Sequence, residues 1–174
     1  MLSSSPRIVI VGAVAGGATA AARARRLDER ASITLLERGG DVSFANCGMP
    51  YYLAGEITDR NRLVLSEPAQ LASMISADVR VHHSVVAIDR AAQVVHVNVR
   101  GGPSGVRIPY DSLLLATGAA PVTHGIGNGV PGVFTLRTLA DMDAIDAWIR
   151  RVTASAAADN RRARYYLWRW LCGA

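Results

Sequence analysis

Two residues whose side chains could take part in chemistry lie ten positions apart in this chain, the acid Glu37 and the thiol Cys47. Glu37 follows a glycine-rich segment at residues 12–17, and Cys47 lies within Ser-Phe-Ala-Asn-Cys-Gly-Met-Pro-Tyr-Tyr at residues 43–52. A glycine-rich turn after one strand, together with an acid at the end of the next strand, is typical of a dinucleotide-binding site. A thiol tethered beside such a site indicates electron transfer between a bound cofactor and sulfur.

The glycine segment reads Val-Gly-Ala-Val-Ala-Gly-Gly-Ala at residues 11–18. Backbone N–H groups of such a turn meet a pyrophosphate at the positive end of the helix that follows. Glu37 comes 25 residues after Gly12, close to the roughly 20 expected for an acid that holds the ribose. Val14 stands where the usual template has its middle glycine. A tight turn in any α/β protein would look similar, and the acid favours nucleotide binding.

Cys47 has two interpretations that its position alone leaves open. A lone cysteine is commonly a small buried hydrophobic residue. Its neighbours Asn46, Gly48 and Pro50 instead suit a loop entering a helix, and a helix N-terminus lowers the pKa of a thiol.

The elements that must position these residues follow from the apolar pattern. A strand at 7–11, a helix at 15–30 and a strand at 32–36 form a βαβ unit. Further along we expect helices at 68–75 and 139–150, and strands at 79–83, 85–89, 94–99 and 112–116. The predicted fold is α/β, with a Rossmann-like nucleotide-binding unit and a small β insertion near residues 79–108.

Charge and composition exclude several classes of function. The net charge is +5, but the excess of positive charge lies in the last 25 residues, which contain six arginines and a single acid, Asp159. The body therefore has no basic face for nucleic acid, and no apolar run reaches the ~18–20 residues that span a bilayer. The four histidines lack ligand spacing, so we expect no metal. We expect a cytoplasmic protein with no nucleic-acid or membrane partner.

Together these residues resemble the N-terminal third of the pyridine nucleotide-disulfide oxidoreductases, and within them the single-cysteine coenzyme A-disulfide reductase-like branch. The resemblance covers about residues 6–150. It rests on Glu37 and on the motifs at residues 11–19, 25–28, 43–51 and 114–118. This branch tolerates valine at the position of Val14.

The resemblance implies FAD as cofactor, with NAD(P)H as electron donor in the full-length family. Cofactor-binding residues would be Gly12, Val14, Ala15, Gly16, Gly17, Glu37, Arg38, Thr117 and Gly118. Cys47 would be catalytic, and Ser43, Asn46 and Arg26 would contact the substrate, a small disulfide such as coenzyme A disulfide. A homodimer is expected for a full-length form.

The implied reaction passes electrons from NAD(P)H through flavin to a mixed disulfide of Cys47 with coenzyme A. The alternative is an NADH oxidase or peroxidase that uses a cysteine sulfenic acid. Those enzymes tend to carry Ser-Cys and a histidine in the first helix turn, whereas Asn46 precedes Cys47 here and residues 13–19 contain no histidine. Peroxide chemistry therefore ranks second. A non-catalytic nucleotide-binding remnant is a further alternative.

The expected organisation has three parts. Residues 1–120 form the first segment of the FAD-binding domain, and residues 121–150 form a linker and helix leading toward an NAD(P)-binding domain. Residues 151–174 depart from the family pattern. A one-base shift across Trp168 to Gly173 reads Gly-Gly-Gly-Phe-Val-Gly for suitable codons, so we interpret this tail as a frameshift product. On that interpretation the chain alone is inactive.

Overall fold

The computed structural model describes residues 5–125, 127 and 129–155, which fall into two compact units. The first unit comprises the chain up to Phe44 together with Val64–Gly118. The second comprises Ala45–Leu63 and the chain from Ala119 onward. The domain bounds expected at residues 120 and 150 stay a prediction, and most of the expected tail lies outside the described residues.

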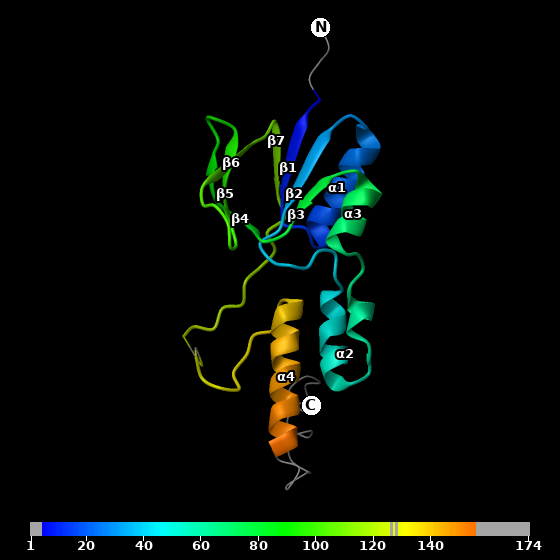
Figure 1. Ribbon diagram of the computed structural model, residues 1–174, viewed down its shortest axis with the longest axis vertical. Coiled ribbons are helices and arrows are strands. Elements are labelled where there is room, and N and C mark those ends of the chain that lie inside the picture. The colour runs from blue at the N-terminus through cyan, green and yellow to red at the C-terminus, as the bar shows by residue number, and fades with distance from the viewer. Residues whose placement is uncertain (1–4, 126, 128, 156–174) are drawn as a thin grey trace. The chain divides into compact units, whose positions relative to one another are not determined.

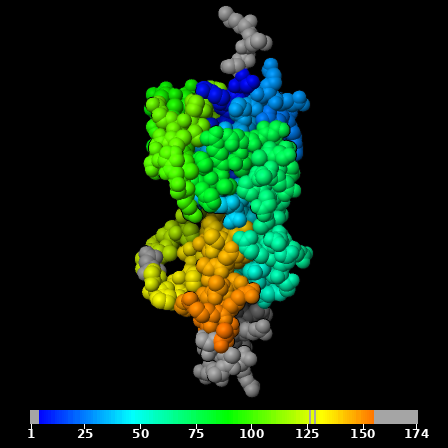
Figure 2. Space-filling model, in the orientation of Figure 1, coloured from blue at the N-terminus to red at the C-terminus, as the bar shows by residue number. Residues whose placement is uncertain are grey.

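The first unit is built on a parallel sheet of four strands in the order β3-β2-β1-β7. These are β1 (Arg7–Val11), β2 (Ser32–Leu36), β3 (Asp78–Arg80) and β7 (Ser112–Leu115). Helices α1 (Ala15–Leu27) and α3 (Pro68–Ile75) cover one face, and an antiparallel sheet covers the other (Figure 1). That second sheet contains β4 (His83–Asp89), β5 (Val94–Val99) and β6 (Val106–Pro109). Residues of this second sheet lie within the green part of the surface in Figure 2.

Alternation along the strands gives the unit two apolar cores, because successive side chains of a strand face opposite sides of the sheet. Ile10 and Leu35 belong to the cluster that includes Ala21 of α1 and Ile75 of α3. Their neighbours in sequence, Val9 and Leu36, join a cluster with the second sheet, which supplies Val95, Val97 and Ile108. Both faces of β1 and β2 are therefore buried, as expected for a parallel sheet.

Most of the predicted elements are confirmed, including the βαβ unit, the strands at 7–11, 32–36 and 94–99, and the helix at 68–75. The strand predicted at 79–83 is confirmed only in its first two residues, because β3 ends at Arg80. His82 has a φ of 59°, which turns the chain after β3, and β4 then begins at His83. β3 pairs with β2 in the parallel sheet, so the insertion consists of β4, β5 and β6. β6 was not predicted.

The helix predicted to reach Arg30 ends at Leu27. Arg25 explains this end, since its guanidinium donates hydrogen bonds to the carbonyl oxygens of Asp28 and Glu29, beyond the helix, and of Ile75 and Ser76 at the end of α3. Carbonyl groups at helix C-termini lack partners within the helix. Arg25 therefore ties the C-terminal ends of α1 and α3 together.

The second unit contains two short 3-10 helices, η1 (Asn46–Gly48) and η2 (Arg60–Leu63), with α2 (Met49–Ala54) and α4 (Leu139–Ser155). The Arg60 guanidinium donates two hydrogen bonds of 2.8 Å to the Asp143 carboxylate, which links η2 to α4. α4 extends five residues past the predicted end at Arg150. In the described part of the chain, no helix combines the length and apolarity needed to cross a bilayer.

Candidate functional site

The turn between β1 and α1 requires two of its glycines for the fold itself. Gly12 has a φ of 98°, and a Cβ there would lie 2.2 Å from the carbonyl oxygen of Ala116. A Cβ on Gly17 would lie 1.7 Å from the carbonyl oxygen of Gly12. Both distances are impossible, so a side chain at either position would push α1 or β7 away from β1.

Gly16 differs from these two glycines. It is exposed, and the nearest atom to a Cβ placed there is Cβ of Ala116 at 3.5 Å, an ordinary contact. The packing of the described residues therefore does not require glycine at this position. A bare backbone at this position also allows close approach of a ligand.

The N-terminus of α1 is open to an anion at the same place. Val14 occupies the cap position, makes no side-chain cap, and the first turn contains no acid. The first amide groups of a helix have no partner within the helix and carry a partial positive charge. Ala15 and Gly16 thus present backbone N–H groups suited to phosphate oxygens.

Glu37 lies just beyond β2 and is only 9% exposed. Its Oε2 accepts a hydrogen bond of 3.0 Å from the N–H of Ala13, and its Oε1 accepts one of 2.8 Å from the N–H of Gly39. A carboxylate has about four lone-pair sites, so Glu37 keeps capacity for a ligand hydroxyl while it holds the glycine turn.

A cavity of about 130 Å³ lies at the carboxyl ends of the strands of this unit. The sheet order reverses here, because β2 and β7 lie on opposite sides of β1, and ligands of open α/β sheets bind at such a point. The cavity is lined by Val11, Gly12, Leu36, Glu37, Arg38, His83, Ser84, Val85 and Thr117. Gly118, with a φ of 65°, directly follows Thr117.

The cavity thus brings together Gly12, Glu37, Arg38 and Thr117 of the predicted cofactor site. The predicted site did not include the other five lining residues. Val11 and Leu36 end the strands β1 and β2, and His83, Ser84 and Val85 come from β4. The position of these β4 residues depends on a backbone contact, since the N–H of His83 donates to the carbonyl oxygen of Glu37 at 2.8 Å. No local sequence motif predicts a contact between segments so far apart in the sequence.

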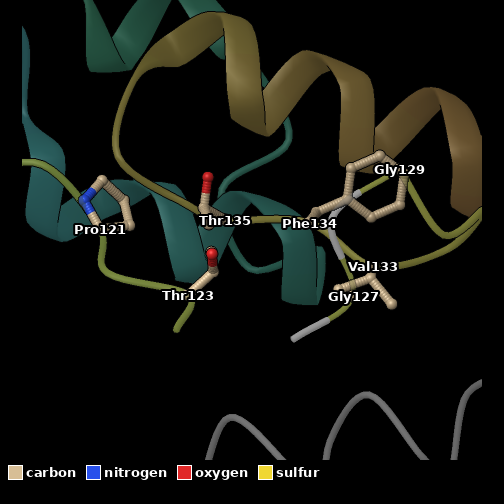
Figure 3. A pocket seen from close by; sticks show the side chains of 7 residues that line it. All are labelled: Pro121, Thr123, Gly127, Gly129, Val133, Phe134 and Thr135. Carbon is tan, nitrogen blue, oxygen red and sulfur yellow. The ribbon is translucent and has the colours of Figure 1, made fainter. Parts of the chain in front are cut away.

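A larger cavity of about 340 Å³ lies within the second unit (Figure 3). Its lining residues are Pro121, Thr123, Gly127, Gly129, Val133, Phe134 and Thr135. They include no acid, base or thiol, and threonine hydroxyls are their polar side-chain groups. We therefore place the candidate site at the smaller cavity, where a buried acid and a helix N-terminus meet.

Cys47 lies in η1, within the second unit, and its free thiol is exposed. The N–H of Ala45 donates to the carbonyl oxygen of Leu63 at 2.8 Å, and the N–H of Gly48 donates to that of Ala45 at 3.1 Å. A Cβ on Gly48 would lie 2.4 Å from Cδ2 of Leu63, whose side chain is buried. Close packing of Gly48 and Met49 thus holds this turn with its thiol at the surface.

The three predicted substrate residues lie on different segments. Ser43 has a φ of 46° and donates its N–H to the carbonyl oxygen of Ala13 at 3.0 Å, so its backbone is anchored at the glycine turn. Asn46 opens η1 directly before Cys47. Arg26 is exposed near the end of α1. Within the described residues no group of acids, histidines and cysteines could hold a metal ion.

A family model described as pyridine nucleotide-disulphide oxidoreductase matches residues 6–154. The chain belongs to this family. Enzymes of the pyridine nucleotide-disulphide oxidoreductase family depend on FAD and NAD(P)H. The residues of the glycine turn and Glu37 fit the ADP half of such a dinucleotide, because they combine open helix amides with a carboxylate.

Coenzyme A disulfide reductase from Staphylococcus aureus (strain JH9) is 39% identical over 145 residues, which cover 83% of this chain and 33% of that relative. The structure of reduced CoADR-RHD from Bacillus anthracis has a TM-score of 0.82 at 39% identity, covering 86% of this chain and 27% of that one. A NAD-dependent persulfide reductase from A. fulgidus has a TM-score of 0.76 at 34% identity, covering 83% and 27%. The chain spans about a third of the length of its curated relative.

Proposed function

We propose that this chain is the FAD-binding and thiol-bearing part of a flavin-dependent disulfide reductase. In the complete reaction, electrons from NAD(P)H would reach coenzyme A disulfide or a related small disulfide through Cys47. The observation that carries the proposal is the exposed, unhindered Gly16 at an uncapped helix N-terminus beside the cavity that contains Glu37. The name of the curated relative at 39% identity supports coenzyme A disulfide as substrate, whereas the structure at 34% identity is of a persulfide reductase.

The cofactor would lie along the cavity with its pyrophosphate at the start of α1. Gly12 and Gly17 shape the turn, and the N–H groups at Ala15 and Gly16 would donate to phosphate oxygens. Glu37 would accept from the ribose hydroxyls with its remaining lone pairs. Val14, Arg38, Thr117 and Gly118 would complete the surroundings of the cofactor. Bound FAD would supply two-electron redox chemistry.

Cys47 would act as a nucleophile on the disulfide. Its thiolate attacks one sulfur of coenzyme A disulfide, which forms a Cys47–S–S–CoA bond and expels one coenzyme A thiolate. Two electrons then break this mixed disulfide and return the Cys47 thiolate and the second coenzyme A thiolate. One cysteine suffices, because the substrate provides the second sulfur. Ser43, Asn46 and Arg26 would contact coenzyme A.

The proposal also covers the location, partners and oligomeric state of the complete enzyme. We infer a cytoplasmic enzyme that acts on a small molecule and binds neither nucleic acid nor membrane. A homodimer is proposed for a full-length form. NADH and NADPH are both compatible with the described residues.

The test uses the chain loaded with FAD and reduced by light with EDTA under anaerobic conditions, so that no nicotinamide site is needed. Coenzyme A disulfide is then added, and flavin absorbance and released thiol are followed. The expected inactivity of the chain alone concerns turnover with NAD(P)H. In this half-reaction, which supplies the electrons by light, we expect reoxidation of the flavin with release of two coenzyme A thiols for each flavin. The Cys47→Ser variant should retain FAD but release thiol no faster than free reduced FAD.

Three results would contradict the proposal. The chain fails to retain FAD, or the Cys47→Ser variant releases thiol as fast as the wild type, or coenzyme A disulfide leaves the reduced flavin unchanged. Faster reoxidation by hydrogen peroxide, with trapping of a sulfenic acid on Cys47, would favour the oxidase or peroxidase alternative.

A further inference from the structure

His83 opens β4 and is one of the residues that line the cavity of about 130 Å³. Its N–H donates to the carbonyl oxygen of Glu37 at 2.8 Å, whereas the N–H of Gly12 donates to that of Leu36, also at 2.8 Å. Successive carbonyl groups of an extended chain face opposite sides. Gly12 and His83 therefore flank the end of β2 from opposite sides, with Glu37 between them.

The order Gly12, Glu37, His83 across the end of β2 determines which way a nucleotide would lie in the cavity. Phosphate groups belong at the α1 end, beside Gly12 and Gly16, where the helix amides are open. Glu37 in the middle accepts from ribose hydroxyls. The base then lies at the other end, beside His83, Ser84 and Val85. This placement rests on the proposed function, since it takes the ADP half of FAD as the ligand.

The ring of His83 has a defined hydrogen-bonding pattern. Nδ1 lies 2.7 Å from the carbonyl oxygen of Val81. Because a carbonyl oxygen can only accept, Nδ1 must carry the proton, and Nε2 of the neutral ring is then an acceptor. An acceptor complements the exocyclic amino group of adenine, whereas a 6-oxopurine presents its own acceptor oxygen at that position.

We propose that His83 is a specificity residue that selects adenine over 6-oxopurines through Nε2. The other polar side chains of the cavity do not supply this preference. The remaining lone pairs of Glu37 are assigned to the ribose hydroxyls. The guanidinium of Arg38 has donors alone, which suit an oxo group better than an amino group. The hydroxyls of Ser84 and Thr117, which also line the cavity, both donate and accept and so favour neither group. The other group that could recognise the base is the backbone of β4, an edge strand of its sheet.

The test compares the affinities of ADP and IDP, which differ in the group at C6 of the base, by calorimetry at about pH 8, where free imidazole is neutral. We expect wild type to prefer ADP by about tenfold or more. His83→Phe keeps an aromatic ring without the acceptor and should bring the two affinities together. His83→Gln restores an acceptor oxygen and should recover part of the preference. His96→Phe is the matched control, since His96 lies in β5 and does not line the cavity.

If a folded His83→Phe variant still preferred ADP over IDP, the proposal would be overturned, and recognition of the base would be assigned to the β4 backbone. Equal affinities in the wild type would also overturn it. The outcome separates from that of the proposed function, because nucleotide binding needs no turnover. A chain that prefers ADP through His83 but reduces no disulfide would contradict the reductase alone, and absence of ADP binding would contradict both.

Discussion

Gly16→Ala distinguishes a glycine that serves a ligand from glycines that serve the fold. An alanine Cβ at this position would meet Cβ of Ala116 at 3.5 Å, and no other atom lies nearer. Alanine is favoured over glycine in helices by up to about 1 kcal/mol. We therefore expect the free energy of unfolding to stay unchanged or to rise by up to about 1 kcal/mol.

Nucleotide binding should respond in the opposite direction. The added methyl group lies beside the first amide groups of α1, where the pyrophosphate would approach the backbone. A hydrogen bond to a charged group contributes about 1.5–3 kcal/mol, so the loss of one corresponds to a roughly 10- to 150-fold weaker affinity. We expect such a loss for both ADP and FAD.

Chemical denaturation and calorimetry measure the two effects separately. Gly17→Ala is the matched control, because its Cβ would lie 1.7 Å from the carbonyl oxygen of Gly12. That variant should be strongly destabilised or fail to fold. A Gly16→Ala protein that binds ADP like the wild type would refute the role of Gly16 in ligand approach. Equal destabilisation of both variants would show that the fold requires glycine at each position.

Three further predictions concern stability. Glu37→Gln leaves one of two backbone amides without its acceptor and should lower the free energy of unfolding by about 1–3 kcal/mol in urea; an unchanged value would contradict the role of the carboxylate in holding the turn. Arg25→Ala should lower it by a similar amount, about 1–3 kcal/mol, whereas the exposed Arg26→Ala control should stay within about 0.5 kcal/mol; equal effects would be the contrary result. Hydrogen bonds from the side chain and backbone of Arg7 lower the pKa of Asp111 to about 2. Because this pKa lies below the unfolded value of about 3.9, the contribution is present above about pH 4 and lost as the pH falls toward 2. Asp111→Asn should therefore lower the thermal midpoint at neutral pH but not near pH 2, and a difference of the same size at both values would contradict this assignment.

The sequence was sufficient for the central βαβ unit, because buried parallel strands are apolar throughout and glycines mark their ends. It was not sufficient at residues 79–83, where the left-handed conformation of His82 turns the chain between strands of two sheets. β3 has three residues, too few for a pattern to separate it from β4. Tertiary pairing with β2 decides its limits.

The candidate site was predictable to a similar extent. Gly12, Glu37 and Thr117 could be named because each follows a strand whose end is visible in the sequence. The different roles of Gly16 and Gly17 could not, since they depend on distances to Ala116 and Gly12 across the turn. The residues of β4 that line the cavity were equally inaccessible, because a backbone hydrogen bond to Glu37 places them there.

The most direct test of the proposed cofactor site is equilibrium binding of FAD and of FMN to the purified chain, followed by flavin fluorescence. FMN lacks the ADP half that Gly16 and Glu37 would hold. We expect one FAD for each chain and an FMN affinity lower by about tenfold or more. Equal affinities for the two flavins, or no binding of FAD, would contradict the assignment of this cavity to a dinucleotide.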